Sequence, residues 1–295
     1  MAGQDRKQFS LEELVFLFET LERLQSPCVL MGGQSACYWA RRFLPVEPSL
    51  REMEQVSQFV SKDVDFQGSR QAAIDLARAL HATPEVPGFR QAFGNLMAGK
   101  MTLGGGAERL SIEVLRKVPG LTENEVARLS GMEPFAHLFF RVLNPLAVLM
   151  AKAWNVVHIT KEGRHDAEQL LALMPCVRAY LRGFLESGAT DETVLRAGLN
   201  LVERALKFAE LPLARKAAQR CGVDWTWLLP HRFIAASTVP QVVRLREQRL
   251  PHWLARISRY ERMVPTSTVV LRLLAILATH AEPWCVPLAH TSIRR

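Results

Sequence analysis

Hydrophobic positions recur at helical spacing near the start of the chain. Between residues 11 and 24 the apolar side chains fall three or four positions apart, as on one face of a helix. Ser10 precedes this run, and Glu13 follows Ser10 by three residues, which is the spacing of a capping box. The pattern predicts an amphipathic helix over residues 11–24.

Short apolar runs then alternate with helical patterns. Such runs, bounded by glycine or polar residues, favour buried strands, and spacing of three or four favours helices. Strands are predicted at residues 28–31, 59–66, 96–103 and 110–115, and helices at residues 34–43 and 70–81. Three consecutive glycines at residues 104–106 indicate the turn between the last two strands.

From Pro145 onward almost every segment has helical period, interrupted by glycine and proline. Asn144 is a good N-cap, and proline at the first helical position loses no hydrogen bond. The sequence therefore predicts an α+β fold. A small mixed-sheet domain is expected over residues 1–145, followed by an all-helical part over residues 146–295.

Composition narrows the class of protein. Hydrophobic residues form 48% and charged residues 22% of the 295 positions, which excludes a disordered or collagen-like chain. No run of about 18 apolar residues occurs, so no membrane-spanning helix is expected. The five cysteines form no CxxC pair and no zinc-ligand spacing. A cytoplasmic protein is the expectation.

Charge is distributed unevenly along the chain. Residues 1–206 hold 23 Lys+Arg against 24 Asp+Glu, a net charge of −1. Residues 207–295 hold 14 against 5, a net charge of +9. Lysine and arginine displace condensed counterions from phosphates, so this surplus favours a polyanionic partner for the C-terminal part. The alternative is a set of solvated basic helix faces.

Paired carboxylates stand within residues 61–66, whose sequence is SKDVDF. Side chains alternate along a strand, so Asp63 and Asp65 share one face while Val64 and Phe66 point to the core. Two carboxylates this close repel unless a cation lies between them, and oxygen ligands suit Mg²⁺ bound together with nucleotide phosphates. The alternative is a solvated strand edge.

Two glycines precede the helix predicted over residues 34–43. Residues 32–35, with the sequence GGQS, follow a buried strand and open that helix. Glycine lets the backbone approach a phosphate closely, and the free N–H groups of the helix start attract its charge. Ser35 could add a hydroxyl donor. The alternative is that Gly32 and Gly33 serve only the turn.

The order of these motifs resembles the polymerase-beta-like nucleotidyltransferase superfamily. Downstream, residues 144–146 (NPL) open a helix carrying Lys152, and residues 164–170 (RHDAEQL) follow on the next helix. This order is similar to the AbiEii type of nucleotidyltransferase, the toxin half of type IV toxin–antitoxin systems. The resemblance covers about residues 28–175, and its motifs are short.

The resemblance implies a role for each matching residue. It implies nucleotide binding by Gly32, Gly33, Ser35 and Lys152, metal binding by Asp63 and Asp65, and catalytic roles for Asp63, Asp65, Lys152 and Asp166. Taken alone, Lys152 could extend its ammonium to solvent, and Asp166 could complement a helix dipole.

The chain departs from the family pattern in two respects. Ser35 and Asp63 are 28 positions apart, longer than the usual gap, so residues 45–58 form an insertion under this alignment. The third carboxylate common in the superfamily has only Glu113 as its candidate. Glu113 lies between Ile112 and Val114 on a predicted strand, which fits a metal ligand and equally fits an exposed strand glutamate.

Other motifs of known enzymes are missing or incomplete. Residues 94–100 (GNLMAGK) imitate a phosphate-binding loop, but Met101 replaces the Ser/Thr that would bind magnesium, and a strand follows. The histidines lack HExxH spacing, and no GxSxG sequence occurs.

The C-terminal part carries two basic clusters with interleaved aromatic residues. The clusters are Arg215, Lys216 and Arg220, and then Arg244, Arg246, Arg249, Arg256, Arg259 and Arg262; the aromatic residues are Trp225, Trp227, Trp253 and Tyr260. Such aromatics could stack RNA bases or form core.

The sequence predicts a magnesium-dependent nucleotidyltransferase that transfers a nucleoside monophosphate from an NTP to RNA, with tRNA as the expected acceptor. The resemblance adds a toxin role and a cognate antitoxin protein as partner; no membrane partner is expected. The alternatives are a small-molecule nucleotidyltransferase, such as one acting on an antibiotic, and a non-catalytic relative that binds nucleic acid or protein.

Overall fold

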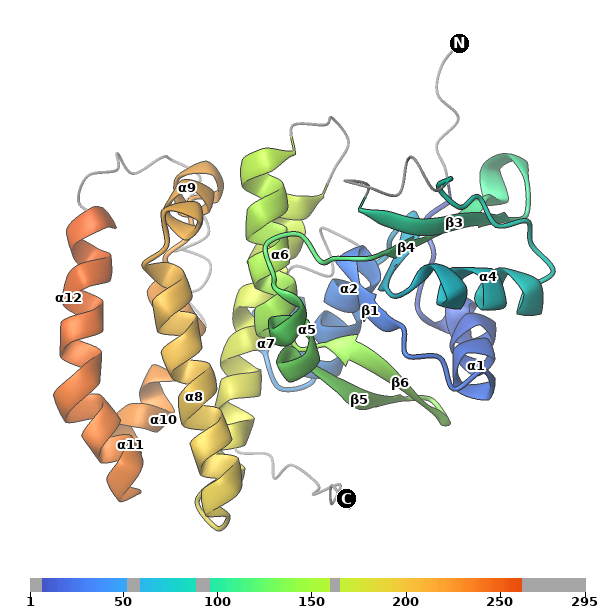
Figure 1. Cartoon of the computed structure of the whole chain (residues 1–295). Helices are drawn as coiled ribbons and strands as arrows, with labels where there is room; N and C mark the ends of the chain where they lie inside the picture. The colour runs from blue at the N-terminus through green and yellow to red at the C-terminus, as the bar shows by residue number, and fades with distance from the viewer. Residues whose placement is uncertain (1–6, 52–58, 89–95, 160–164, 262–295) are drawn as a thin grey trace.

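A mixed sheet followed by a row of helices forms the structure (Figure 1). The computed structural model describes residues 7–51, 59–88, 96–159 and 165–261. The sheet lies in the first part of the chain, and the described residues from Pro145 onward are helical apart from short connections. The predicted α+β class, with a small mixed sheet before an all-helical part, is confirmed.

The sheet has six strands in the order β3-β4-β2-β1-β6-β5. Their bounds are β1 Val29–Met31, β2 Asp63–Gln67, β3 Met97–Leu103, β4 Leu110–Leu115, β5 Ser130–Phe135 and β6 Leu138–Leu143. Pairing is parallel between β1 and β6 and between β2 and β4, and antiparallel in the other three pairs. The shortest strand, β1, therefore joins the two halves of the sheet.

Helices flank and follow the sheet. In the first part they are η1 Glu12–Leu14, α1 Val15–Arg23, α2 Gly32–Phe43, α4 Arg70–Ala79, η3 Gly106–Glu108 and α5 Glu123–Leu129. The later ones are α6 Pro145–His158, α7 Asp166–Ser187, α8 Glu192–Ala209, α9 Pro212–Cys221, η4 Trp225–Leu228, α10 His231–Ala236, α11 Pro240–Arg244, η5 Leu245–Arg249 and α12 Leu250–Glu261. In Figure 1 this later part extends away from the sheet, with α12 at the far end.

Most predicted elements occur, with shifted ends. The Asn144 side chain accepts the Ala147 N–H at 2.9 Å and caps α6, as predicted. At the first helix only half of the capping box forms, because the Ser10 N–H donates to the Glu13 carboxylate while Leu11 takes the N-cap position. The strand predicted from residue 59 begins at Asp63, since Ser61 forms only an isolated bridge to Phe9.

The β5–β6 hairpin and α5 were not predicted. Gly131 and Pro134 interrupt β5, which removes the alternation that identifies a strand. The apolar run of β6 continues through Asn144 into α6, so its periodicity does not separate the strand from the helix.

Helix α2 lies at the centre of the packing. Its Trp39 is 1% exposed, donates Nε1–H to the Leu143 carbonyl at 2.8 Å, and meets the Tyr180 ring of α7 at 5.4 Å. Helix α2 also packs against both α6 and α7. The start of α2 is therefore fixed between the sheet and the helical part.

No helix in the part of the chain that the structure describes is long and apolar enough to cross a membrane.

Candidate functional site

The start of α2 lies directly against β2. Gly32 has a φ of +69°, and a Cβ atom there would lie 2.0 Å from Oδ2 of Asp65. A Cβ atom at Gly33 would lie 2.4 Å from Oγ of Ser61. Glycine is therefore required at both positions, because the Asp65 and Ser61 side chains lie too close for a Cβ atom. The Asp65 carboxylate adjoins the first turn of the helix.

Gly32→Ala should destabilise the protein by at least about 1–2 kcal/mol, because a left-handed φ is costly for any residue with a Cβ. The clash with Asp65 should also displace the carboxylate and weaken any metal binding there. Chemical denaturation and Mg²⁺ titration measure the two effects. The matched control is Gly105→Ala, where a Cβ meets no atom within 4 Å; equal behaviour of the two variants would contradict the account.

The alternation predicted for the paired carboxylates is observed. Val64 and Phe66 are 0% and 1% exposed, whereas Asp63 and Asp65 are half-buried. Strand β1 pairs with β2 so that Met31 lies opposite Asp65. Both carboxylates of β2 therefore lie outside the core, at the end of the strand where α2 begins.

Glu113 is the register partner of Asp65 on the parallel strand β4. Its Oε1 lies 2.7 Å from Nζ of Lys100, the residue opposite it on β3. Within the described ranges, no group of three or more His, Cys, Asp or Glu side chains is placed to hold a metal ion. The structure thus offers Asp63 and Asp65 as the oxygen pair, while Glu113 is engaged by an ammonium group.

Ser35 and Gln34 are fully buried in the first turn of α2. The Ser35 hydroxyl donates to the Gly32 carbonyl at 2.9 Å, and the Gln34 amide donates to the Phe9 carbonyl at 2.9 Å. Both side chains brace the turn that presents Gly32 and Gly33. Phosphate binding at this turn would therefore use backbone N–H groups.

Lys152 and Asp166 form a buried ion pair. Nζ of Lys152 lies 2.8 Å from Oδ1 of Asp166, and the residues are 5% and 6% exposed. The Asn155 side-chain amide donates to the same carboxylate oxygen at 3.3 Å. The two residues that the sequence assigned to separate helices thus neutralise each other between α6 and α7.

This ion pair adjoins the early turns of α2. Burial raises the pKa of the Cys37 thiol, and the positive charge of Lys152 acts on the same thiol in the opposite direction. Gln169, one turn after Asp166, has its amide nitrogen 3.2 Å from the Cβ position of Gly33. The structure therefore gathers the glycine turn, the β2 carboxylates and the ion pair around one end of α2.

The buried cysteines near α2 are poor nucleophiles. Burial raises the pKa of Cys37 to about 12 and also raises the pKa of Cys28 and of Cys176. Each remains a neutral thiol at pH 7, whereas the thiolate is the reactive form.

Many of the C-terminal arginines have protein partners. Arg220 donates to the Val156 and Val157 carbonyls, Arg246 to the Ala235 carbonyl at 2.7 Å, Arg249 pairs with Glu203, and Arg256 pairs with Glu210 at 3.1 Å. Arg256 also stands over the Trp253 ring. The side chains of Arg259 and Tyr260, and all of Arg262, lie outside the described residues.

Two of the exposed basic residues in these clusters have no partner among the described side chains. Lys216 on α9 and Arg244 on α11 form no ion pair or hydrogen bond with another described side chain. Trp225 is 3% exposed and donates Nε1–H to the Ala214 carbonyl, so it belongs to the core. The surface available to a polyanion is thus smaller than the charge count indicates.

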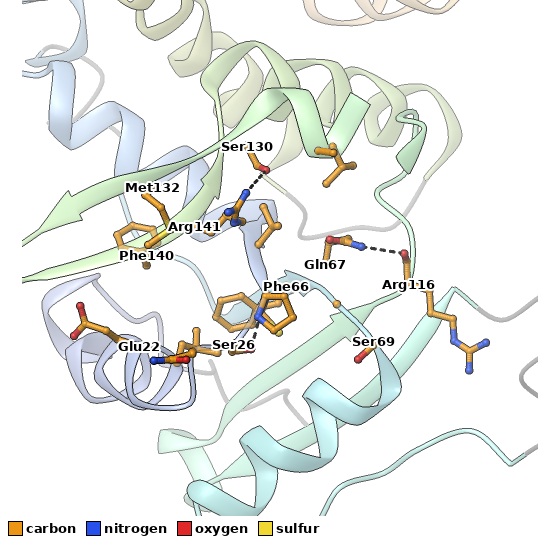
Figure 2. A pocket seen from close by; sticks show the side chains of 18 of the residues that line it. Glu22, Ser26, Phe66, Gln67, Ser69, Arg116, Ser130, Met132, Phe140 and Arg141 are labelled. Carbon is orange, nitrogen blue, oxygen red and sulfur yellow. Dashed lines mark hydrogen bonds between the residues drawn. The ribbon is translucent and has the colours of Figure 1, made fainter. Parts of the chain in front are cut away.

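A cavity of about 1040 Å³ lies elsewhere, at the opposite end of β1 and β2. None of the site residues predicted from sequence lines it; its walls come from α1, α4, α5, β2, β5 and β6 (Figure 2). No sequence motif indicates this cavity, because its lining comes from several short segments spread over Leu21 to Arg141.

No family model matches the chain, and no curated protein matches it significantly. Among solved structures it is similar to an antigenic nucleotidyltransferase-like protein from Paracoccidioides brasiliensis, with 13% identity, a TM-score of 0.39, and coverage of 65% of this chain and 95% of that one. The TM-score is too low to assign that protein's fold to this chain.

Proposed function

We propose that this protein is a magnesium-dependent nucleotidyltransferase that transfers a nucleoside monophosphate from an NTP to an RNA acceptor. One observation carries the proposal: the Asp65 carboxylate adjoins the glycine turn at the start of α2. A candidate metal ligand and a candidate phosphate-binding turn are thereby adjacent, as nucleotide transfer requires.

Asp63 and Asp65 fit a magnesium ion. Both are oxygen donors on one side of β2 and outside the core, and Mg²⁺ is commonly held by one or two carboxylates plus substrate phosphates. Bound there, the metal would offset charge that develops as an acceptor hydroxyl attacks the α-phosphate and pyrophosphate leaves. Glu113 is a candidate third ligand only if Lys100 releases it.

The start of α2 would bind the triphosphate. Its N–H groups and helix dipole favour an anion, and Gly32 and Gly33 permit close approach of the phosphates. The buried pair of Lys152 and Asp166 would hold α6 and α7 against this turn. In this scheme residues 1–145 hold the NTP, and residues 146–295 contribute the ion pair and the acceptor surface.

Calorimetric titration with each NTP, with and without Mg²⁺, tests this site. We expect binding that requires the metal and is lost in Asp65→Asn. A second candidate function, a non-catalytic relative, is favoured by the Lys100–Glu113 pair and by the lack of a three-carboxylate group among the described residues. Binding of nucleotide without dependence on Mg²⁺ would support that candidate.

The net charge of +9 over residues 207–295 favours RNA as the acceptor, and tRNA is the RNA for a first experiment. Replacing exposed Lys216 and Arg244 by glutamine should weaken RNA binding. The slope of log K against log salt concentration should become less steep by about 0.7–0.9 per lost phosphate contact. Fluorescence anisotropy over a salt series measures this slope. Exposed Lys117→Gln, in the sheet part, is the control; an unchanged slope in the double variant would remove these residues from the RNA surface.

The proposal extends to a toxin role in the cytoplasm, which a cognate antitoxin protein would inhibit. Expression of the wild-type chain should slow the growth of a bacterial host, whereas the Asp63→Asn variant should leave growth unchanged. Growth curves at matched protein levels measure the difference. Equal growth of the two strains would contradict the toxin role without bearing on nucleotide transfer.

A further inference from the structure

Strand β6 has a partner along only half of its inner side. It spans Leu138–Leu143, and β5 pairs with it over its whole length. On the other side β1 has only three residues, and its register pairs Leu30 with Val142. The first half of β6 therefore has a strand neighbour on one side only.

The backbone of Phe139 shows where this unpaired edge points. Phe139 lies opposite Pro134 of β5. The Phe139 N–H donates to Oε1 of Glu22, on α1, at 3.4 Å. An exposed side chain from α1 thus occupies a position that a backbone carbonyl takes in a sheet.

The 1040 Å³ cavity opens beside this edge. Buried Phe66 and Phe140 contribute to its apolar lining, and Gln67 and Ser69 form the wall opposite β6 (Figure 2). The volume is at the upper end of the range of about 300–1,000 Å³ for ligand pockets. The space is large enough for a short length of extended chain.

Exposed side chains beside the cavity suit such a chain. Met132 and Phe139 are each 55% exposed, and Arg141 lies directly opposite Met132 on the neighbouring strand. The lining contains three arginines, Arg70, Arg116 and Arg141, against two glutamates, Glu22 and Glu123. The net charge of these five side chains is +1, which favours an acidic partner.

We propose that this cavity binds an acidic, extended peptide segment of a partner protein, which adds as a strand along the first half of β6. A peptide carbonyl would accept the Phe139 N–H in place of Glu22, because main-chain hydrogen bonds give such complexes their affinity. An apolar side chain would cover Met132 and Phe139, and a carboxylate would pair with Arg141. This interaction does not depend on the proposed nucleotide transfer.

A fluorescent, end-blocked hexapeptide of alternating valine and glutamate is the probe. Anisotropy titration of the full chain should show saturable binding, and the Phe139 backbone amide should shift in ¹⁵N-resolved NMR spectra. Arg141→Glu should weaken binding roughly tenfold, whereas Arg128→Glu, an exposed arginine on α5 outside the cavity, should not. Glu22→Ala should strengthen binding, since it removes the competitor for the Phe139 N–H.

Three results would overturn the proposal. One is the absence of saturable binding of the peptide. Another is equal binding by a peptide that is N-methylated at alternate residues, because the methylated edge of that peptide cannot pair with a strand. The third is displacement of the peptide by a uridine hexanucleotide whose binding is lost in Arg141→Glu. This result would make the cavity an RNA site.

Discussion

Asp63→Asn or Asp65→Asn is expected to lower nucleotide transfer by on the order of 10³-fold, because removal of one charge-stabilising group from a transfer site has an effect of this size. The fold should survive, since both side chains lie outside the core while Val64 and Phe66 remain buried. Without metal, stability should be unchanged or slightly higher, because a repulsive charge is removed. Label transfer from an α-labelled NTP and thermal unfolding measure the two quantities.

Asp75→Asn is the matched control. Asp75 is a half-buried aspartate on α4 whose carboxylate pairs with Arg78 of the same helix, and it does not line the start of α2. Its replacement should leave transfer within about twofold of wild type, as for most surface changes. Full activity in either β2 variant would remove the metal-site assignment.

Lys152→Met is expected to destabilise the protein by about 3–5 kcal/mol, because it leaves the buried Asp166 carboxylate without its ammonium partner. The double variant Lys152→Met with Asp166→Leu should recover most of this loss, since apolar residues of similar volume often replace a buried ion pair at little cost. Urea denaturation of the two single variants and the double variant measures the coupling.

Transfer activity in the double variant separates two roles of the ion pair. If the pair only holds α6 and α7 against α2, the double variant should regain activity together with stability. If Lys152 contacts the nucleotide, the double variant should be stable and inactive. Additive stability losses in the cycle would contradict the buried pair itself.

The local elements around the site were predictable because each depends on short-range pattern. The buried run before Gly32, the alternation across Asp63 and Asp65, and the Asn144–Pro145 helix start all occur near their predicted positions. Glycine, proline and alternation act over a few residues, and a single sequence displays them directly.

The pairing of charges was not predictable in the same way. Lys100 meets Glu113 because the turn between β3 and β4 sets their register. Lys152 meets Asp166 because α6 packs against α7. Burial then decides what each pair does. The same holds for Arg246, whose carbonyl partners on α10 are set by tertiary packing.

Nucleotide transfer itself is the most direct test of the account. Purified protein, total RNA and each α-labelled NTP should yield a discrete labelled RNA band only when Mg²⁺ is present, and Asp65→Asn should abolish the band. Label on small molecules alone would indicate a small-molecule nucleotidyltransferase. Absence of label from every acceptor, with all four NTPs and intact wild-type fold, would contradict the proposal that this protein is a nucleotidyltransferase.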